Sequence, residues 1–263
     1  MSTWEVILLG IIQGITEFLP VSSSGHLTLA QLLLGLEDPS TYIVFDLVCH
    51  LGTLLAILAV FRSEILDILS GNLREAGRVL IGTLPLFPLL LVLKEVKSAY
   101  DTPELLGLFF LITSLILFLG IHLRLPSPTR PWRKMGVDPI SIGIFQALAV
   151  LPGISRSGST ISAAQILGWS RKEAVAFSFL LAIPAILGGS ALEVFKLVTE
   201  EQAATVHAIG IGQYLIAFFL SAAVGWLALR LLIRMVLQER LMVFVWYCCF
   251  LGVACLWYFN FVV

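Results

Sequence analysis

Long apolar stretches alternate with short polar connections along the chain, a pattern typical of membrane-spanning helices. An α-helix needs about 20 mostly apolar residues to cross about 30 Å of hydrocarbon. Six segments approach or exceed that length, and we expect each to be a transmembrane helix: 41–61, 77–93, 104–123, 173–196, 208–230 and 241–263.

Two further apolar regions, 3–36 and 139–169, are interrupted near their middle by serine and glycine. Each half is too short to cross the bilayer comfortably, so we predict two re-entrant hairpins that return to the side they entered from. Backbone groups and hydroxyls that face lipid are costly, and the interruptions must therefore line a polar cavity enclosed by protein. We expect this cavity to be the functional site.

Composition supports an integral membrane protein. The hydrophobic fraction is 59% and the charged fraction 13%, against about 25% charged residues in soluble domains. The net charge of −1 excludes a basic surface for nucleic acid. The first apolar run lacks a basic start and contains Gln13 and Glu17, so we expect it to be retained rather than cleaved as a signal peptide.

Basic residues are unevenly distributed over the connections. If both interrupted regions are re-entrant, twelve of the sixteen lysines and arginines lie on one side of the membrane and three on the other. The positive-inside rule makes the first side cytoplasmic and places both termini outside. The twelve lie in 62–78, 124–138, 171–172 and 230–240, and the three are Lys94, Lys97 and Lys196.

Residues 10–36 and 143–169 align at an offset of 133 residues. Nine of the 27 positions are identical, among them a Ser-x-Ser-Gly core. We interpret this as a duplication, although apolar segments also share residues by chance. Three spans separate the copies, so the second enters from the opposite face, and inverted repeats bring interrupted helices together near the bilayer midplane.

The predicted architecture is thus a single all-α membrane domain over residues 1–263. It has six transmembrane helices plus two re-entrant helical hairpins related by an inverted internal repeat. Repeat one covers about 3–123 and repeat two about 139–263.

The first interruption reads PVSSSGH over residues 20–26, and Gln13 and Glu17 share a helical face just before it. An intramembrane carboxylate needs a cation or a strong donor, so Glu17 either binds a divalent metal, acts as an acid or base, or pairs with Arg156. A serine close to His26 could act as a nucleophile, with the imidazole as its base. Alternatively, a serine caps the next helix and His26 lines a water pocket.

The second interruption reads PGISRSGST over residues 152–160, and a helix begins there. The amides and positive dipole end of that helix favour an anion. Arg156 adds a planar guanidinium that matches phosphate oxygens, and Ser155, Ser157 and Thr160 add donors. We infer an anionic, phosphorylated ligand, which is compatible with Arg156 also neutralising Glu17.

Asp46 and His50 form another pair four residues apart, near the outer end of the span 41–61. They either extend the site or its metal shell, or satisfy each other as a polar pair.

Both interruptions resemble motifs of the undecaprenyl-diphosphate phosphatases of the bacitracin-resistance type. Residues 13–26 (QGITEFLPVSSSGH) resemble the (Glu/Gln)-x-x-x-Glu box of that family with its Pro-Val-Ser-Ser-x-Gly-His continuation. Residues 151–160 (LPGISRSGST) resemble its Pro-Gly-x-Ser-Arg-Ser-x-x-Thr box. The match extends along the whole chain and includes 45–46 (FD) and 50–53 (HLGT).

The resemblance implies hydrolysis of the C55 polyprenyl diphosphate to the monophosphate and inorganic phosphate, which recycles the lipid carrier for peptidoglycan synthesis. It also implies a divalent cation, Mg²⁺ or Ca²⁺, near the glutamate box. The expected location is the bacterial inner (cytoplasmic) membrane, with the site facing the periplasm or cell exterior. A homodimer is compatible with the sequence.

Carried over onto this chain, the family pattern makes Glu17 a contact of the metal or diphosphate and Ser23 the favoured nucleophile. His26 would be the base or proton relay, and Arg156 would bind phosphate. Gln13 stands where many members have glutamate, which leaves one fewer carboxylate for a metal. The remaining expected substrate-binding residues are Ser22, Ser24, Ser155, Ser157 and Thr160.

Two questions stay open at this point. The sequence does not decide whether Ser23 or His26 forms a covalent intermediate or water attacks directly. A membrane transporter or lipid flippase is the competing function, because inverted repeats with broken helices are also typical of transporter folds.

Overall fold

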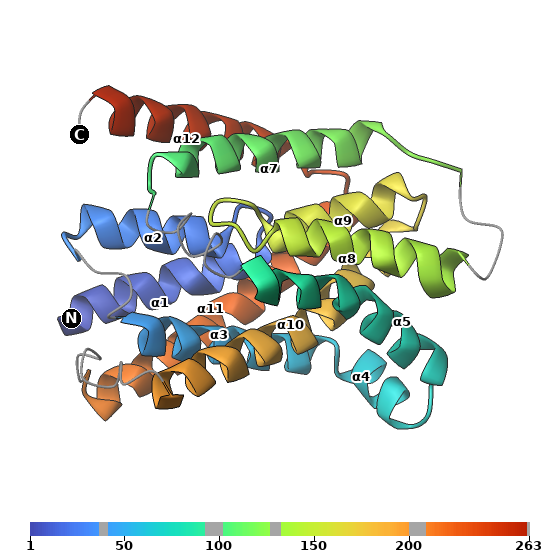
Figure 1. Ribbon diagram of the computed structural model, residues 1–263, viewed down its shortest axis with the longest axis horizontal. Coiled ribbons are helices and arrows are strands. Elements are labelled where there is room, and N and C mark those ends of the chain that lie inside the picture. Colours follow the sequence, from blue (N-terminus) through green and yellow to red (C-terminus); the bar gives the residue numbers. More distant parts are fainter. Residues whose placement is uncertain (37–41, 93–101, 127–132, 200–208, 262–263) are drawn as a thin grey trace.

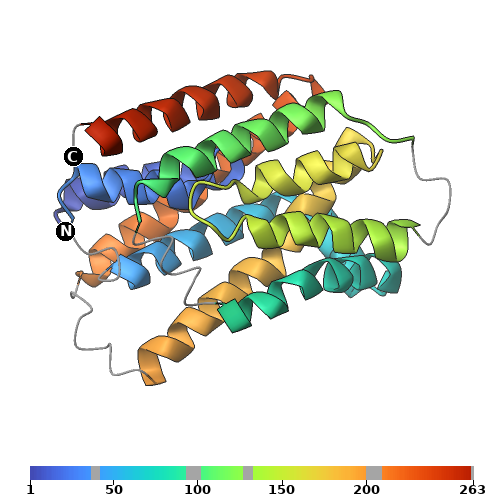
Figure 2. The ribbon, with the colours of Figure 1, turned by 45° about the horizontal axis from the view of Figure 1, so that its top comes forward.

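The computed structural model describes residues 1–36, 42–92, 102–126, 133–199 and 209–261, and every regular element in these ranges is helical. The long helices lie side by side in one bundle, with the start of α1 and the end of α12 at the same end (Figures 1 and 2). The α-helices are α1 (Thr3–Phe18), α2 (Ser23–Leu33), α3 (Ile43–Val60), α4 (Arg62–Leu69), α5 (Leu73–Thr83), α7 (Leu105–His122), α8 (Asp138–Leu148), α9 (Arg156–Ile166), α10 (Arg171–Thr199), α11 (Ile211–Leu237) and α12 (Met242–Phe261).

Five helices within the described ranges are long and apolar enough to cross a membrane: α3, α7, α10, α11 and α12. They correspond to five of the six predicted spans, with ends shifted by a few residues. The chain is therefore a multi-pass membrane protein. Lys94, Lys97 and Arg130, which entered the charge argument, lie outside the described residues.

The sixth predicted span, 77–93, is not one continuous α-helix, and this part of the prediction was wrong. Helix α5 ends at Thr83, and a 3-10 helix follows over Leu84–Val92. Pro85 and Pro88 have no backbone N–H, and the proline ring clashes with the carbonyl one turn earlier, so a regular α-helix is interrupted here.

The two interrupted regions each fold as a pair of helices, α1 with α2 and α8 with α9. The pairs start from opposite ends of the bundle, and their connecting loops meet in its middle (Figures 1 and 2). Gly25 packs against Gly153 so closely that a Cβ on Gly25 would lie 2.8 Å from the Gly153 Cα. The two polar interruptions are therefore in direct contact.

Helix α11 packs against α1 and α3 through small residues. A Cβ on Gly52 of α3 would lie 2.4 Å from the carbonyl oxygen of Phe218, and one on Gly14 of α1 would lie 3.0 Å from that of Ser221. Small residues let helix backbones approach closely where lipid supplies no hydrophobic driving force. Both helices are thus fixed on α11, which sets where Glu17 and His50 stand.

Replacing Gly52 by alanine should lower the free energy of unfolding in detergent by about 1–3 kcal/mol, because the new methyl group collides with the α11 backbone. The control is Gly188→Ala in α10, where a Cβ meets nothing within 4 Å. That variant should be neutral or more stable by about 1 kcal/mol, the helix propensity difference. Equal stability of the two variants would contradict the close approach of α3 and α11.

Candidate functional site at the meeting point of two helical hairpins

Glu17, near the end of α1, is almost wholly buried, with 3% of its side chain exposed. Its Oε1 forms an ion pair with the guanidinium of Arg156, which opens α9 in the other hairpin. Its Oε2 accepts hydrogen bonds from Ser23 Oγ at 2.6 Å and from Gln13 Nε2 at 3.1 Å. His50 Nε2 from α3 lies 3.6 Å from the same oxygen. Glu17 therefore joins both hairpins and a spanning helix.

The pairing of Glu17 with Arg156, one of the roles considered from the sequence, is confirmed. Removing a carboxylate from water costs several kcal/mol, and an ion pair with further hydrogen bonds offsets that cost. A guanidinium carries five N–H donors, and the Arg156 side chain remains 18% exposed. The contact with Glu17 thus leaves donors for an anion that reaches the loop.

Ser22 caps α2 and ties the two loops together. Its Oγ accepts from the backbone N–H of Gly25 at 3.3 Å and from that of Gly153 at 3.0 Å. Its φ is 72°, in the left-handed region, which costs a non-glycine residue about 1–3 kcal/mol. The two hydrogen bonds hold this conformation, and they fix the point at which Ser23 enters the helix.

Ser155 makes the equivalent cap on α9. Its Oγ accepts from the Gly158 N–H at 3.1 Å and lies 3.3 Å from Ser157 Oγ, as Ser22 Oγ lies 3.3 Å from Ser24 Oγ. The aligned serines of the two interruptions thus make matching contacts. These contacts agree with a duplicated motif, which remains a prediction.

Two of the predicted substrate-binding hydroxyls take part in packing. Thr160 Oγ1 lies 2.5 Å from Ser178 Oγ of α10 and donates to the Arg156 carbonyl at 2.9 Å. Ser157 Oγ donates to the Leu19 carbonyl at 3.3 Å. These bonds connect α9 to its neighbours, and the structure does not bring Thr160 to Glu17.

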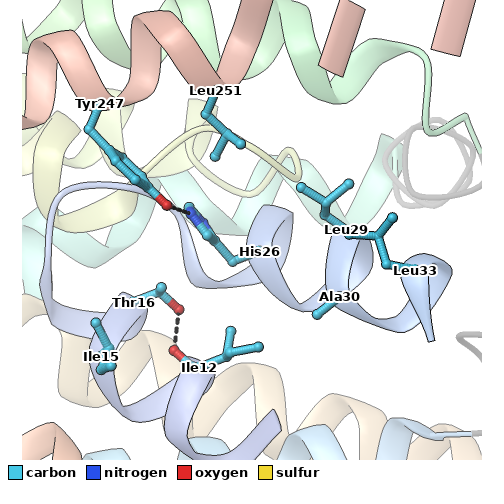
Figure 3. A pocket seen from close by; sticks show the side chains of 9 residues that line it. All are labelled: Ile12, Ile15, Thr16, His26, Leu29, Ala30, Leu33, Tyr247 and Leu251. Carbon is cyan, nitrogen blue, oxygen red and sulfur yellow. Dashed lines mark hydrogen bonds between the residues drawn. The ribbon is translucent and has the colours of Figure 1, made fainter. Parts of the chain in front are cut away.

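His26 points toward Tyr247 of α12 (Figure 3). Its Nδ1 lies 2.7 Å from the Ser22 carbonyl and its Nε2 lies 2.7 Å from the Tyr247 hydroxyl. A carbonyl oxygen only accepts, so Nδ1 carries the proton, and Nε2 of the neutral ring accepts from Tyr247. Ser23 and His26 therefore contact different residues. The Ser23 hydroxyl donates to Glu17, and the basic nitrogen of His26 accepts from Tyr247.

Sequence reasoning missed Tyr247, because a single tyrosine inside an apolar span carries no spacing signal. The same is true of Thr113 on α7. Its hydroxyl donates to the Gly153 carbonyl at 2.8 Å and accepts from the Ser155 N–H at 2.9 Å. Thr113 thus fixes the loop that presents Arg156.

The Asp46 carboxylate and the Nε2 of His50 have separate partners. His50 Nδ1 donates to the Asp46 backbone carbonyl at 2.7 Å, which aims Nε2 at Glu17. The Asp46 carboxylate accepts a long 3.4 Å hydrogen bond from Gln31 of α2. His50 therefore extends the site, whereas Asp46 links α3 to α2.

Protein oxygens for a cation are present but few. In the described part of the chain, no three His, Cys, Asp or Glu side chains gather as metal ligands. Beside Glu17, however, the buried Oε1 of Gln13 has no hydrogen-bond partner among the described residues. Oxygen donors are what Mg²⁺ and Ca²⁺ prefer, and Mg²⁺ commonly completes its shell with substrate phosphates. The residues fit a cation that the ligand helps to hold.

Known proteins resemble this chain along its whole length. The family model described as Bacitracin resistance protein BacA matches residues 6–254. The undecaprenyl-diphosphatase of Protochlamydia amoebophila is 48% identical over 260 residues, 99% of this chain and 100% of the relative. Those of Carboxydothermus hydrogenoformans and Desulfosudis oleivorans are 39% and 41% identical, over 97% and 98% of both chains. The family match includes both polar interruptions, 20–26 and 152–160.

Replacing Arg156 by methionine should lower the free energy of unfolding in detergent by about 3–5 kcal/mol, because it leaves the Glu17 carboxylate buried without a counter-charge. Adding Glu17→Gln should recover part of this loss. The control is Arg171→Met, which removes an ion pair with Glu239 whose side chains are 35% and 67% exposed. That change should cost at most about 1 kcal/mol. Similar losses in both arginine variants would mean that Glu17 is hydrated.

Proposed function

Because this chain belongs to the Bacitracin resistance protein BacA family, we propose that it hydrolyses undecaprenyl diphosphate to undecaprenyl phosphate and inorganic phosphate. The observation that carries the proposal is the contact between Ser23, Glu17 and Arg156 across the two hairpins. It puts a hydroxyl, a proton acceptor and an anion-binding guanidinium in one buried place. The reaction recycles the lipid carrier for peptidoglycan synthesis.

Glu17, rather than His26, is the group placed to take the proton of the nucleophile. Ser23 Oγ already donates to Glu17 Oε2 at 2.6 Å. An incoming diphosphate competes with Glu17 for Arg156, and a carboxylate that loses its counter-charge becomes a stronger proton acceptor. Substrate arrival thus activates the base and brings Arg156 onto the phosphoryl oxygens, whose charge it neutralises.

In the covalent route, Ser23 Oγ bonds to the terminal phosphorus while its proton passes to Glu17, and the bond to the lipid phosphate breaks, so that undecaprenyl phosphate leaves with the proton from Glu17. Water then bonds to the phosphorus while its proton passes to Glu17, and the bond to Ser23 Oγ breaks, which releases inorganic phosphate and returns the proton to the serine. In the alternative route, water held by Glu17 attacks the phosphorus directly, the same carboxylate takes its proton, and undecaprenyl phosphate leaves.

A divalent cation, Mg²⁺ or Ca²⁺, would be held by oxygens of Gln13, Glu17 and Ser23. When bound, it would neutralise charge on the diphosphate oxygens. Gln13 contributes a neutral oxygen, so the protein supplies little negative charge of its own. The support for this role is the buried Gln13 Oε1 without a hydrogen-bond partner in the described ranges.

We further propose that the hairpins are re-entrant from opposite faces of the bacterial inner membrane, as an inverted repeat, and that the site opens to the periplasm or cell exterior. The opposite directions of the two hairpins (Figure 1) support this arrangement, as do the matching caps at Ser22 and Ser155. The one-sided distribution of basic residues supports this orientation. The segment 77–92 would then belong to the sixth crossing, part α-helix and part 3-10 helix. A homodimer stays a prediction.

Purified protein in detergent, given undecaprenyl diphosphate and Mg²⁺, should release inorganic phosphate. Ser23→Ala and Arg156→Ala should each lower kcat by about 10²–10³-fold or more, because each removes a group that acts on the transferring phosphoryl. Ser141→Ala, which removes a hydroxyl that donates to the Val137 carbonyl just before α8, is the control and should keep full activity. A wild-type protein that releases no phosphate, but moves the lipid between vesicle leaflets, would be the transporter or flippase.

Gln13→Leu should raise the cation concentration needed for half-maximal phosphate release several-fold, because it removes an oxygen ligand. Gln146, the aligned glutamine of the second hairpin, is also buried, and Gln146→Leu should leave that concentration unchanged. A titration with Mg²⁺ on both variants measures the difference. If the two curves coincide, Gln13 does not bind the cation.

A further inference from the structure

A groove of about 360 Å³ opens between α1, α2 and α12, next to His26 (Figure 3). Side chains from these three helices make an apolar wall: Ile12, Ile15, Leu29, Ala30, Leu33 and Leu251. Ile15 and Leu33 are 40% and 64% exposed, so the groove is open to the membrane. An apolar chain can therefore enter it sideways from lipid.

The groove has one polar end. Of the polar side chains in its wall, Thr16 is satisfied within its own helix, because its hydroxyl donates to the Ile12 carbonyl at 2.6 Å. The others are His26 and Tyr247, which bond to each other across the groove end (Figure 3). The groove thus combines an apolar wall with a hydrogen-bonded tyrosine–histidine pair, which fits an amphiphile rather than a plain acyl chain.

The polar end can bind an anion without rearrangement of the backbone. The Tyr247 O–H is directed at His26 Nε2, and a small rotation of the hydroxyl aims it at an incoming oxygen. Protonated His26 would add a second donor from Nε2, while the Ser22 carbonyl keeps Nδ1 in place. Donors at the edge of an apolar site interact strongly with a phosphate group.

This polar end lies close to the Glu17 cluster. Ser23 and His26 are three residues apart at the start of α2, on the same face of the helix. Three residues correspond to about 4.5 Å along a helix axis. One diphosphate group can therefore reach Ser23 with one phosphate and His26 with the other.

We propose that Tyr247 and His26 bind the lipid-proximal phosphate of the substrate, and that the first isoprene units lie along the apolar groove between α1, α2 and α12. The terminal phosphate then lies at Ser23 and Arg156. The rest of the polyprenyl chain stays in the bilayer, through the open side of the groove. This inference rests on the proposed function and assigns Tyr247 a place in substrate binding.

The first test is Tyr247→Phe, which removes only the hydroxyl. Phosphate release from undecaprenyl diphosphate should show a KM raised by about 10-fold or more, the usual effect of losing a hydrogen bond to a charged group. The kcat should change much less, because the groups at the terminal phosphate are intact. The control is Tyr258→Phe on the same helix, away from the groove, which should change neither constant.

The second test fills the groove. Ala30→Trp should raise KM for undecaprenyl diphosphate at nearly unchanged kcat. Ala30→Leu should raise KM to a smaller degree, and it keeps the test possible if the tryptophan variant does not fold. Leu115→Trp on α7, where the side chain is 56% exposed outside the groove, is the control for adding bulk. Thermal unfolding of each variant shows whether a change in KM reflects binding or damage to the fold.

The outcomes distinguish failure of the substrate-binding proposal from failure of the proposed function. If wild-type protein releases phosphate but Tyr247→Phe matches Tyr258→Phe, the phosphate does not lie at His26 and Tyr247. If the Ala30 variants match Leu115→Trp, the chain does not lie in the groove. Absence of phosphate release from the wild type would instead overturn the proposed function itself.

Discussion

The ion pair between Glu17 and Arg156 joins two helical hairpins that are far apart in sequence. Neither charge could be buried alone, because removing an unpaired charge from water costs far more than the packing of a short helix returns. Each hairpin therefore needs the other in order to present its motif. Ser22, which caps one helix and accepts from the backbone of the other loop, reinforces the same junction. The meeting of the loops is thus a condition of folding as well as of chemistry.

The same contacts explain how a stable junction can also be reactive. Glu17 is held by Arg156, Ser23 and Gln13 while the site is free of ligand. In the proposed mechanism, a diphosphate would offer Arg156 a competing partner, and the carboxylate would then gain basicity beside the hydroxyl it already contacts. His26 belongs to a neighbouring element of the site, since its basic nitrogen faces Tyr247 at the end of an apolar groove. In the proposed arrangement, Ser23 at the first position of α2 would serve the reaction, and His26, three residues later, would bind the lipid phosphate.

Much of this arrangement was predictable from the pattern of residues. Long apolar runs gave five of the spanning helices, and the serine- and glycine-rich interruptions marked both loops. The pairing of Glu17 with Arg156, one of the alternatives considered for Glu17, was found because each is a charge that needs a partner in a dry interior. The prediction failed at 77–93, where apolar length suggested one helix but Pro85 and Pro88 impose a change of helix type. It also missed Tyr247 and Thr113, whose partners lie far away in the sequence, on α2 and in the loop between α8 and α9.

By itself, the sequence determined which segments enter the membrane and where polar groups interrupt them, because the cost of polar groups in lipid depends on local composition. It also determined that the charges of the two motifs had to meet. Only the tertiary structure decided which atoms pair. Thr160 bonds Ser178, Ser23 bonds Glu17 and His26 bonds Tyr247, and such choices depend on distances and directions between helices, which spacing along one helix does not specify.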